Sequence, residues 1–139
     1  MRDITEKKST LRTAKAQSVV RVGDVSIDAI NNDKVPKGNI FEMAKVAGFL
    51  AVKDCSRVIP HCHPIPIEAC NIDYEIKGND IVIYVEAKTN YKTGIEMEVL
   101  YGASVVAITI YDLLKPIDKS IEIINTKLLY KTGGKSDII

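Results

Sequence analysis

The sequence predicts an α+β protein with an antiparallel sheet and helices packed on one face of it. Two segments repeat apolar residues at the helical period, and four segments alternate apolar with polar residues or are rich in β-branched side chains. These segments follow one another as strand, helix, strand, strand, helix, strand. Because strand pairs are separated by helices, we expect the two helices to cover the same sheet.

The first half of the chain contains one strand and one main helix. Residues 11–22 are rich in Val, Ala and Thr and end at the turn pair Gly23-Asp24, so we expect a strand there, followed by a short helical turn over 26–31. Asn39 is a suitable N-cap, and Glu42 three residues later completes a variant of the capping box. Apolar residues at helical spacing then predict a helix from Asn39 to about Lys53 with one apolar face.

The second half contains a hairpin, a long helix and a last strand. Residues 65–77 and 81–89 alternate in polarity on either side of a Lys-Gly-Asn-Asp turn, which predicts a hairpin. A helix is expected over 95–114, where Pro116 stops it, and a final strand over 121–130. The complete order is that of the ferredoxin-like split βαβ fold, which hosts many functions and so decides nothing about chemistry.

The long helix is apolar nearly all round in its centre. A helix that lies on a sheet with its other side in water does not need this composition. We therefore expect a second protein surface to cover it, which predicts a homo-oligomer.

Length and composition narrow the class of protein. The chain has 139 residues, which fits a single domain over 1–139, with 46% hydrophobic and 27% charged residues and a net charge of +1. This balance argues against bulk electrostatic binding of nucleic acid. No apolar run near 18 residues and no hydrophobic leader is apparent, so we expect no membrane partner. Three irregularly spaced cysteines read as reduced thiols in the cytoplasm.

Both histidines lie in a proline-framed loop, residues 60–66. Residues before proline favour extended backbone, so we expect His61 and His63 to share one side and Cys62 to face away. Zinc ligands are usually separated by two or more residues and no second Cys/His cluster is apparent, so we expect no bound metal. The loop presents groups that exchange protons near neutral pH, although the histidines could simply satisfy loop hydrogen bonds.

Charged residues mark both ends of the long helix. Glu96 and Glu98 lie in its first turn, where the helix dipole alone would favour carboxylates. Asp112 and Lys115 lie three residues apart in its last turn and can form a pair. That pair is either a surface ion pair of little consequence or an acid–base arrangement.

The helix separates these two groups. Glu98 and Asp112 are 14 residues apart, which corresponds to about 21 Å along a helix. They cannot both touch one small substrate within a single chain. If both ends act on one molecule, they come from different subunits.

Basic residues are scattered along the chain, and solvated surface is the default for each of them: Lys7, Arg12, Lys15, Lys37, Lys131 and Lys135. Lys37-Gly38, just before a helix, is a place that favours phosphate. Residues 132–136 look like the end of a phosphate-binding Walker loop, but Leu129 stands where its first glycine would be and no helix follows. The two glycines of this segment still permit a backbone nest for an anion.

Four segments in one order resemble a single known family, the MoaC family of cyclic pyranopterin monophosphate synthases in molybdenum-cofactor biosynthesis. The segments are Ile59–Pro64, Lys92–Glu98, Thr109–Asp112 and Lys131–Ser136. The resemblance covers residues 3–136. His61 stands where the family is associated with a more apolar residue, so His63 is the safer functional assignment.

The resemblance implies a ferredoxin-like homohexamer, a trimer of dimers with active sites at the dimer interface. It implies a lyase that converts a nucleotide-derived cyclic triphosphate (3',8-cyclo-7,8-dihydroguanosine 5'-triphosphate) to cyclic pyranopterin monophosphate and pyrophosphate. The implied catalytic residues are Asp112, Lys115 and Lys37, and the implied substrate-binding residues are Cys62, His63, Glu96, Met97, Glu98, Arg12 and Lys131. No cofactor is expected, although Mg²⁺ could accompany the triphosphate without a dedicated carboxylate cluster.

Two other functions compete with this one. A non-catalytic module that senses a nucleotide or pterin would bind tightly without releasing pyrophosphate. A protein that holds a metal through its His and Cys residues would carry stoichiometric zinc.

Overall fold

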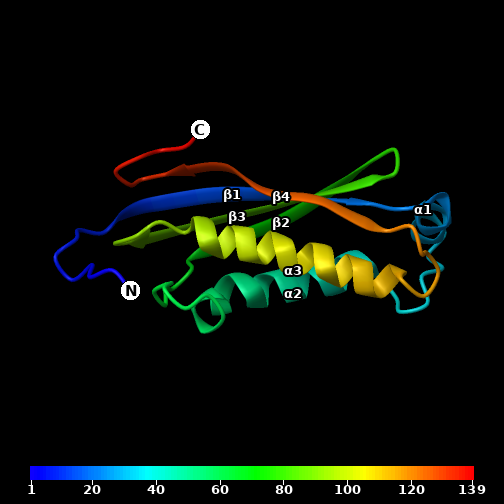
Figure 1. Cartoon of the computed structure of the whole chain (residues 1–139), viewed down its shortest axis with the longest axis horizontal. Helices are drawn as coiled ribbons and strands as arrows, with labels where there is room; N and C mark the ends of the chain where they lie inside the picture. The colour runs from blue at the N-terminus through cyan, green and yellow to red at the C-terminus, as the bar shows by residue number, and fades with distance from the viewer.

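The computed structural model describes the whole chain, Met1–Ile139. A four-stranded sheet carries two long helices on one face, with a short helix at one end (Figure 1). The elements are β1 (Thr10–Arg21), α1 (Asp24–Asn31), α2 (Ile40–Asp54), the 3₁₀ turn η1 (Cys55–Arg57), β2 (Ala69–Lys77), β3 (Asp80–Tyr91), α3 (Glu96–Leu114) and β4 (Glu122–Thr132). The order β2-β3-β1-β4, antiparallel throughout, confirms the α+β class and fits the expected split βαβ connectivity.

The two central strands carry the core side of the sheet. In β1 the small residues Ala14 and Ala16 are fully buried and alternate with partly exposed residues, as a strand with one covered face requires. They pair with Ala87 and Val85 of β3. The helices pack on this face and fill a single hydrophobic core.

Helix α2 begins as the sequence predicts. The Asn39 side chain accepts hydrogen bonds from the backbone N–H groups of Phe41 and Glu42, at 3.0 and 3.2 Å. This half of the capping box is formed, and it satisfies two donors that a helix start leaves free. The N-cap prediction is confirmed.

Helices α2 and α3 approach each other closely at two glycines. A Cβ atom at Gly48 would lie 2.6 Å from a methyl group of Val106, and one at Gly102 would lie 2.5 Å from a methyl group of Val52. The absent side chains therefore let the two backbones come together.

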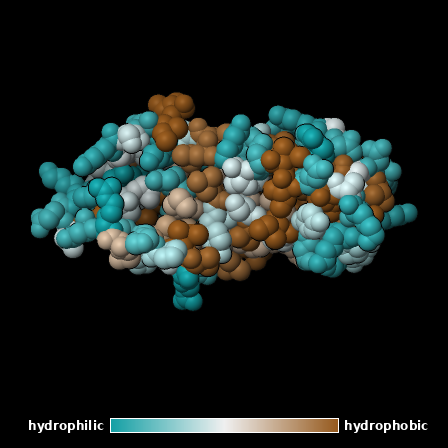
Figure 2. All heavy atoms as spheres, viewed as in Figure 1, coloured by the Kyte–Doolittle hydropathy of each residue, from teal (hydrophilic) through white to brown (hydrophobic).

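About half of the residues of helix α3 are buried. By length and composition alone the helix passes as a candidate membrane span, although the sequence has no unbroken apolar run near 18 residues, and half of its most apolar window is buried inside this fold. Large hydrophobic side chains stay exposed, among them Ile108 of α3 and Ile123 and Ile124 of β4. Figure 2 shows hydrophobic atoms gathered across the middle of this face, between hydrophilic ends.

Strand β2 begins later than the alternation of residues suggests. It starts at Ala69 rather than Ile65. Pro64 and Pro66 lack the N–H group that a ladder bond needs, so they cannot extend the strand. The first backbone–backbone bond between this segment and β3 is donated by Glu68 N–H to the Lys88 carbonyl, at 3.1 Å.

Candidate active site

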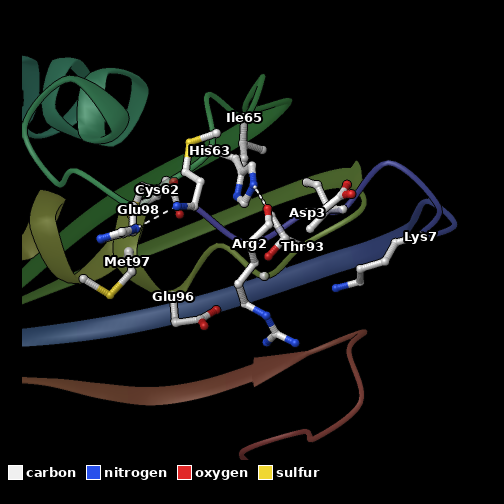
Figure 3. Close-up of a pocket in the computed structure, with 14 residues that line it drawn as sticks. Arg2, Asp3, Lys7, Cys62, His63, Ile65, Thr93, Glu96, Met97 and Glu98 are labelled. Atoms are coloured by element: carbon white, nitrogen blue, oxygen red, sulfur yellow. Dashed lines mark hydrogen bonds between the residues drawn. The ribbon is translucent and has the colours of Figure 1, made fainter.

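The largest cavity lies beside the start of α3. It has a volume of about 510 Å³, and its walls come from the N-terminal segment 1–7, the histidine loop and the first turn of α3 (Figure 3). His61, Cys62, His63, Met97 and Glu98 all line it. The structure thus brings together two of the segments that the sequence singled out.

The histidine loop begins with a turn over residues 59–62, so the prediction of an extended segment is wrong there. Cys62 N–H donates to the Ile59 carbonyl at 3.1 Å, which closes a turn around Pro60. His61 and His63 both contact the N-terminal segment, through Met1 and Arg2, which agrees with the predicted shared side, but Cys62 lines the same cavity and does not face away. His63 Nε2–H donates to the Arg2 carbonyl at 2.8 Å, as the dashed line in Figure 3 shows.

Glu98 is the most buried charged residue of the cavity. Its side chain is 3% exposed, and no hydrogen bond or ion pair joins its carboxylate to another residue. Burial raises the pKa of Glu98 to about 7, its own backbone N–H lowers it, and the Glu96 charge raises it. A buried carboxylate without a partner, open only to a cavity, is suited to a ligand that donates hydrogen bonds.

Cys55, which sequence reasoning did not single out, joins this cluster. The sulfur atoms of Cys55 and Cys62 and a carboxylate oxygen of Glu98 all lie within 4.8 Å of one another, close enough to hold a metal ion. Burial raises the pKa of the Cys55 thiol to about 12. Burial and then Glu98 raise the pKa of Cys62. No sequence signal could have paired Cys55 with Glu98, because the fold alone brings α2 against α3.

A second, basic cavity of about 170 Å³ adjoins the first. Arg12 of β1 is 6% exposed, its Nε atom has no partner, and its Nη2 donates to the Lys92 carbonyl at 3.2 Å. Lys131 Nζ lies 3.4 Å from Glu96 Oε1. The further basic residues of this cavity are Arg2, Lys7 and Lys135.

The neighbouring positive charges affect the pKa of Lys7. Its pKa is lowered, first by desolvation and then by Arg12, Lys135 and Arg2. The sequence analysis treated Lys7 and Lys135 as solvated surface and did not consider Arg2. These three residues come together only in the folded chain. Such a cluster is suited to a multiply charged anion.

The C-terminal segment completes the basic cavity. Gly133 has a φ of 100°, and a Cβ atom there would collide with the Leu11 backbone. A Cβ atom at Gly134 would lie 2.6 Å from an Arg12 nitrogen. The glycine pair that resembles a Walker end therefore lets the segment after β4 lie against Leu11 and Arg12.

A second cluster lies at the far end of α3. Lys115 Nζ lies 3.0 Å from Asp112 Oδ1, and Lys37 Nζ lies 3.5 Å from Asp112 Oδ2. Lys37 also donates to the Asp112 carbonyl at 3.2 Å. Lys115 and then Lys37 lower the pKa of Asp112. The predicted Asp112–Lys115 pair is confirmed, and Lys37 joins it from the loop before α2.

The two clusters do not meet within one chain. Helix α3 is continuous over Glu96–Leu114, so Glu98 and Asp112 stay about 21 Å apart along it. Met97, next to Glu98, is 38% exposed at the cavity mouth. Whether the clusters meet across two chains remains a prediction.

Comparison with known proteins identifies the family. The sequence model of the MoaC family matches residues 1–134. Cyclic pyranopterin monophosphate synthase from Clostridium perfringens is 42% identical over 138 residues, which cover 98% of this chain and 87% of that protein. The protein of the same name from Bacillus subtilis is 43% identical over 140 residues, 98% of this chain and 82% of its own length. Four motifs, two adjoining cavities and these matches agree, and the chain belongs to the MoaC family.

Proposed function

We propose that this chain is a cytoplasmic cyclic pyranopterin monophosphate synthase, a lyase of molybdenum-cofactor biosynthesis. Its substrate is the cyclic dihydroguanosine triphosphate, and its products are cyclic pyranopterin monophosphate and pyrophosphate. The observation that carries the proposal is the joining of two unlike cavities. Arg2, Lys7 and Glu96 line both the cavity that contains Glu98 and the basic cavity around Arg12.

The first cavity suits the purine-derived ring. A guanine-type edge presents two adjacent N–H donors, and an ionised carboxylate accepts two parallel hydrogen bonds. Glu98, which is 3% exposed and lines this cavity, offers a carboxyl group with no competing partner. Cys62, His63 and Met97 line the same space and would enclose the ring.

The basic cavity suits the triphosphate. The buried Arg12 guanidinium keeps a donor free, and Lys131 lies beside it on the neighbouring strand β4. Charge-assisted hydrogen bonds from these groups to phosphate oxygens would orient the chain of phosphates. They would also offset the negative charge that develops on departing pyrophosphate.

The chemistry needs proton transfer as well as binding. Ring opening requires protons to move to and from nitrogen, with a bound water. Closing the cyclic phosphate requires a sugar hydroxyl to attack the inner phosphorus while the bond to pyrophosphate breaks. We assign the proton transfers to Asp112, Lys115 and Lys37, which form the one compact acid–base cluster at the other end of α3. No organic cofactor is assigned, and Mg²⁺ would enter with the triphosphate.

These two groups of residues require a shared site. We propose a homohexamer, a trimer of dimers, in which Asp112 of one chain completes the cavity around Glu98 of its partner. Exposed hydrophobic residues on α2, α3 and β4 support an extended protein–protein contact; they include Val46, Leu50, Ile108 and Ile123. Such residues are costly to leave in water.

The direct test is product formation. Purified protein is incubated with the cyclic triphosphate, and pyrophosphate and the pterin product are measured by a coupled assay and by mass spectrometry. Equal amounts of both products are expected. Saturable binding of the triphosphate without pyrophosphate release would instead identify a sensor, and the proposal would be wrong.

A further inference from the structure

We infer that Cys55, Cys62 and Glu98 form a binding site for a thiophilic divalent cation such as Zn²⁺, and that this ion competes with the substrate. The binding site stands on the geometry alone. The competition rests on the proposed function, because that function assigns Cys62 and Glu98 to the substrate ring.

The ligand atoms suit such an ion in type and spacing. Two sulfur atoms and one carboxylate oxygen lie within 4.8 Å of one another. A tetrahedral zinc ion with Zn–S bonds of about 2.3 Å and Zn–O bonds of about 2.1 Å separates its ligand atoms by roughly 3.6–3.8 Å. Side-chain rotations that move the ligand atoms by an ångström or so would therefore bring all three atoms into bonding distance of one ion.

The three residues come from separate, well-anchored parts of the fold. Cys55 lies in η1, directly after α2, and its side chain is 1% exposed. Cys62 is held by the turn that its N–H closes with Ile59. Glu98 lies in the first turn of α3, which packs on α2. A site assembled from rigid elements needs little ordering when an ion binds.

A second observation points to a ligand at this place. The Glu98 carboxylate is nine-tenths buried or more, is joined to no other residue, and opens into the cavity. A cation bonded to its oxygen would replace the water that burial removes. The imidazoles of the same cavity are already engaged, His63 with the Arg2 carbonyl and His61 with the chain terminus, so they are not assigned as ligands.

Three protein ligands leave the fourth position of a tetrahedral ion open to the cavity. Sites of this kind hold a water or another small ligand there. An ion so placed takes both the carboxylate and the thiol away from the purine-derived ring. The substrate and the ion therefore exclude each other.

Binding is tested with Co²⁺, which reports thiolate ligands by a near-ultraviolet charge-transfer band and tetrahedral geometry by visible absorption. Reduced, metal-free protein is titrated with Co²⁺, and Zn²⁺ then displaces it. We expect the band in the unaltered protein and in Cys70→Ser, whose half-buried cysteine lies in β2 outside the cluster. In Cys55→Ser, the affinity for Co²⁺ should fall roughly tenfold or more, and the charge-transfer band should lose intensity.

A second variant guards against misfolding of Cys55→Ser. Glu98→Gln keeps the size of the side chain and removes its charge, so it should also weaken Co²⁺ binding while circular dichroism stays unchanged. Equal affinity in the unaltered protein, Cys55→Ser and Glu98→Gln would overturn the site. Absence of a thiolate band in the unaltered protein would overturn it as well.

Competition is tested by pyrophosphate release at several Zn²⁺ concentrations. Zn²⁺ should raise KM and leave kcat unchanged, and Cys55→Ser should keep metal-free turnover while resisting Zn²⁺. An unchanged KM, with the Co²⁺ spectrum intact, would overturn the competition alone. A metal-free protein that binds Co²⁺ but never releases pyrophosphate would refute the proposed function and leave the metal site standing.

Discussion

Glu98 and Asp112 stand at opposite ends of one unbroken helix, about 21 Å apart along α3. Glu98 is buried, and the negative charge of Glu96 acts on it. Asp112 is exposed and lies beside the positive charges of Lys115 and Lys37. One small molecule cannot contact both within a single chain. The proposed activity therefore depends on how two chains meet.

Subunit mixing tests this dependence. Glu98→Ala and Asp112→Ala are each expected to be inactive, because each lacks one half of every site. In a mixed dimer, one site has both residues and the other has neither. Random exchange of equal amounts should therefore restore about a quarter of the unaltered activity, measured by pyrophosphate release.

Native mass spectrometry shows whether the mixed dimers have formed. If they form and activity does not return, Glu98 and Asp112 do not serve one shared site. Activity in an isolated single chain would contradict the shared site equally.

Replacement of Lys115 probes proton transfer. Lys115→Ala should lower kcat by about 10²–10⁴-fold with little change in KM, because general acid–base groups contribute that much. Lys119→Ala, at an exposed lysine four residues on, is the matched control. Steady-state kinetics on both variants gives the answer, and near-normal kcat in a correctly assembled Lys115→Ala would remove this lysine from the chemistry.

Replacement of Arg12 probes the phosphate end. Arg12→Met should weaken triphosphate binding by about 1.5–3 kcal/mol, the usual contribution of a hydrogen bond to a charged group. Arg21→Met, on the same strand but paired with Asp80, should bind normally. Isothermal calorimetry measures both, with thermal unfolding as the control for folding. Equal affinities for the two variants would place the phosphates elsewhere.

Local patterns predict the elements better than they predict the sites. The Asn39 cap, the hairpin and the stop at Pro116 follow from neighbouring residues, and the structure confirms all three. The Asp112–Lys115 pair is also local, since three residues on a helix share a face.

The parts that sequence reasoning missed depend on contacts between distant segments. Cys55 meets Glu98 only because α2 packs on α3, and Lys135 meets Arg12 only because the segment after β4 lies against β1. The loop around Pro60 was predicted as extended, because the preference of residues before proline was applied to the whole segment. The bond from Cys62 N–H to the Ile59 carbonyl instead closes a turn with Pro60 as its second residue, a position that favours proline.

The contact between α2 and α3 predicts a stability effect. Gly102→Ala would place a methyl group 2.5 Å from Val52, so the helices must separate or Val52 must leave its rotamer. We expect a loss of about 1–3 kcal/mol in the free energy of unfolding. Ser104→Ala, on the same helix, adds no atom and loses only the hydroxyl bond to the Leu100 carbonyl, so it is the control. Urea unfolding at pH 7 compares them, and an unchanged midpoint for Gly102→Ala would show that the helix contact is loose.

The buried carboxylate of Asp118 predicts a dependence of stability on pH. Burial acts to raise its pKa, but hydrogen bonds from the Ser26 and Ser120 hydroxyls and from the Ser120 and Gly23 backbone N–H groups outweigh this and lower the pKa to about 2. A lowered pKa means that the ionised form favours the folded state. Its contribution of about 2 kcal/mol is thus present above pH 4 and is lost as the pH falls toward 2.

Asp118→Asn should therefore be less stable than the unaltered protein at pH 7, and the difference should shrink between pH 4 and pH 2. Urea unfolding of both proteins at several pH values measures it. Asp73→Asn, at an exposed position on β2, should show no comparable difference at any pH. If the difference in the free energy of unfolding between the two proteins stays constant down to pH 2, hydrogen-bond geometry, rather than the charge of Asp118, joins α1 to the segment after α3.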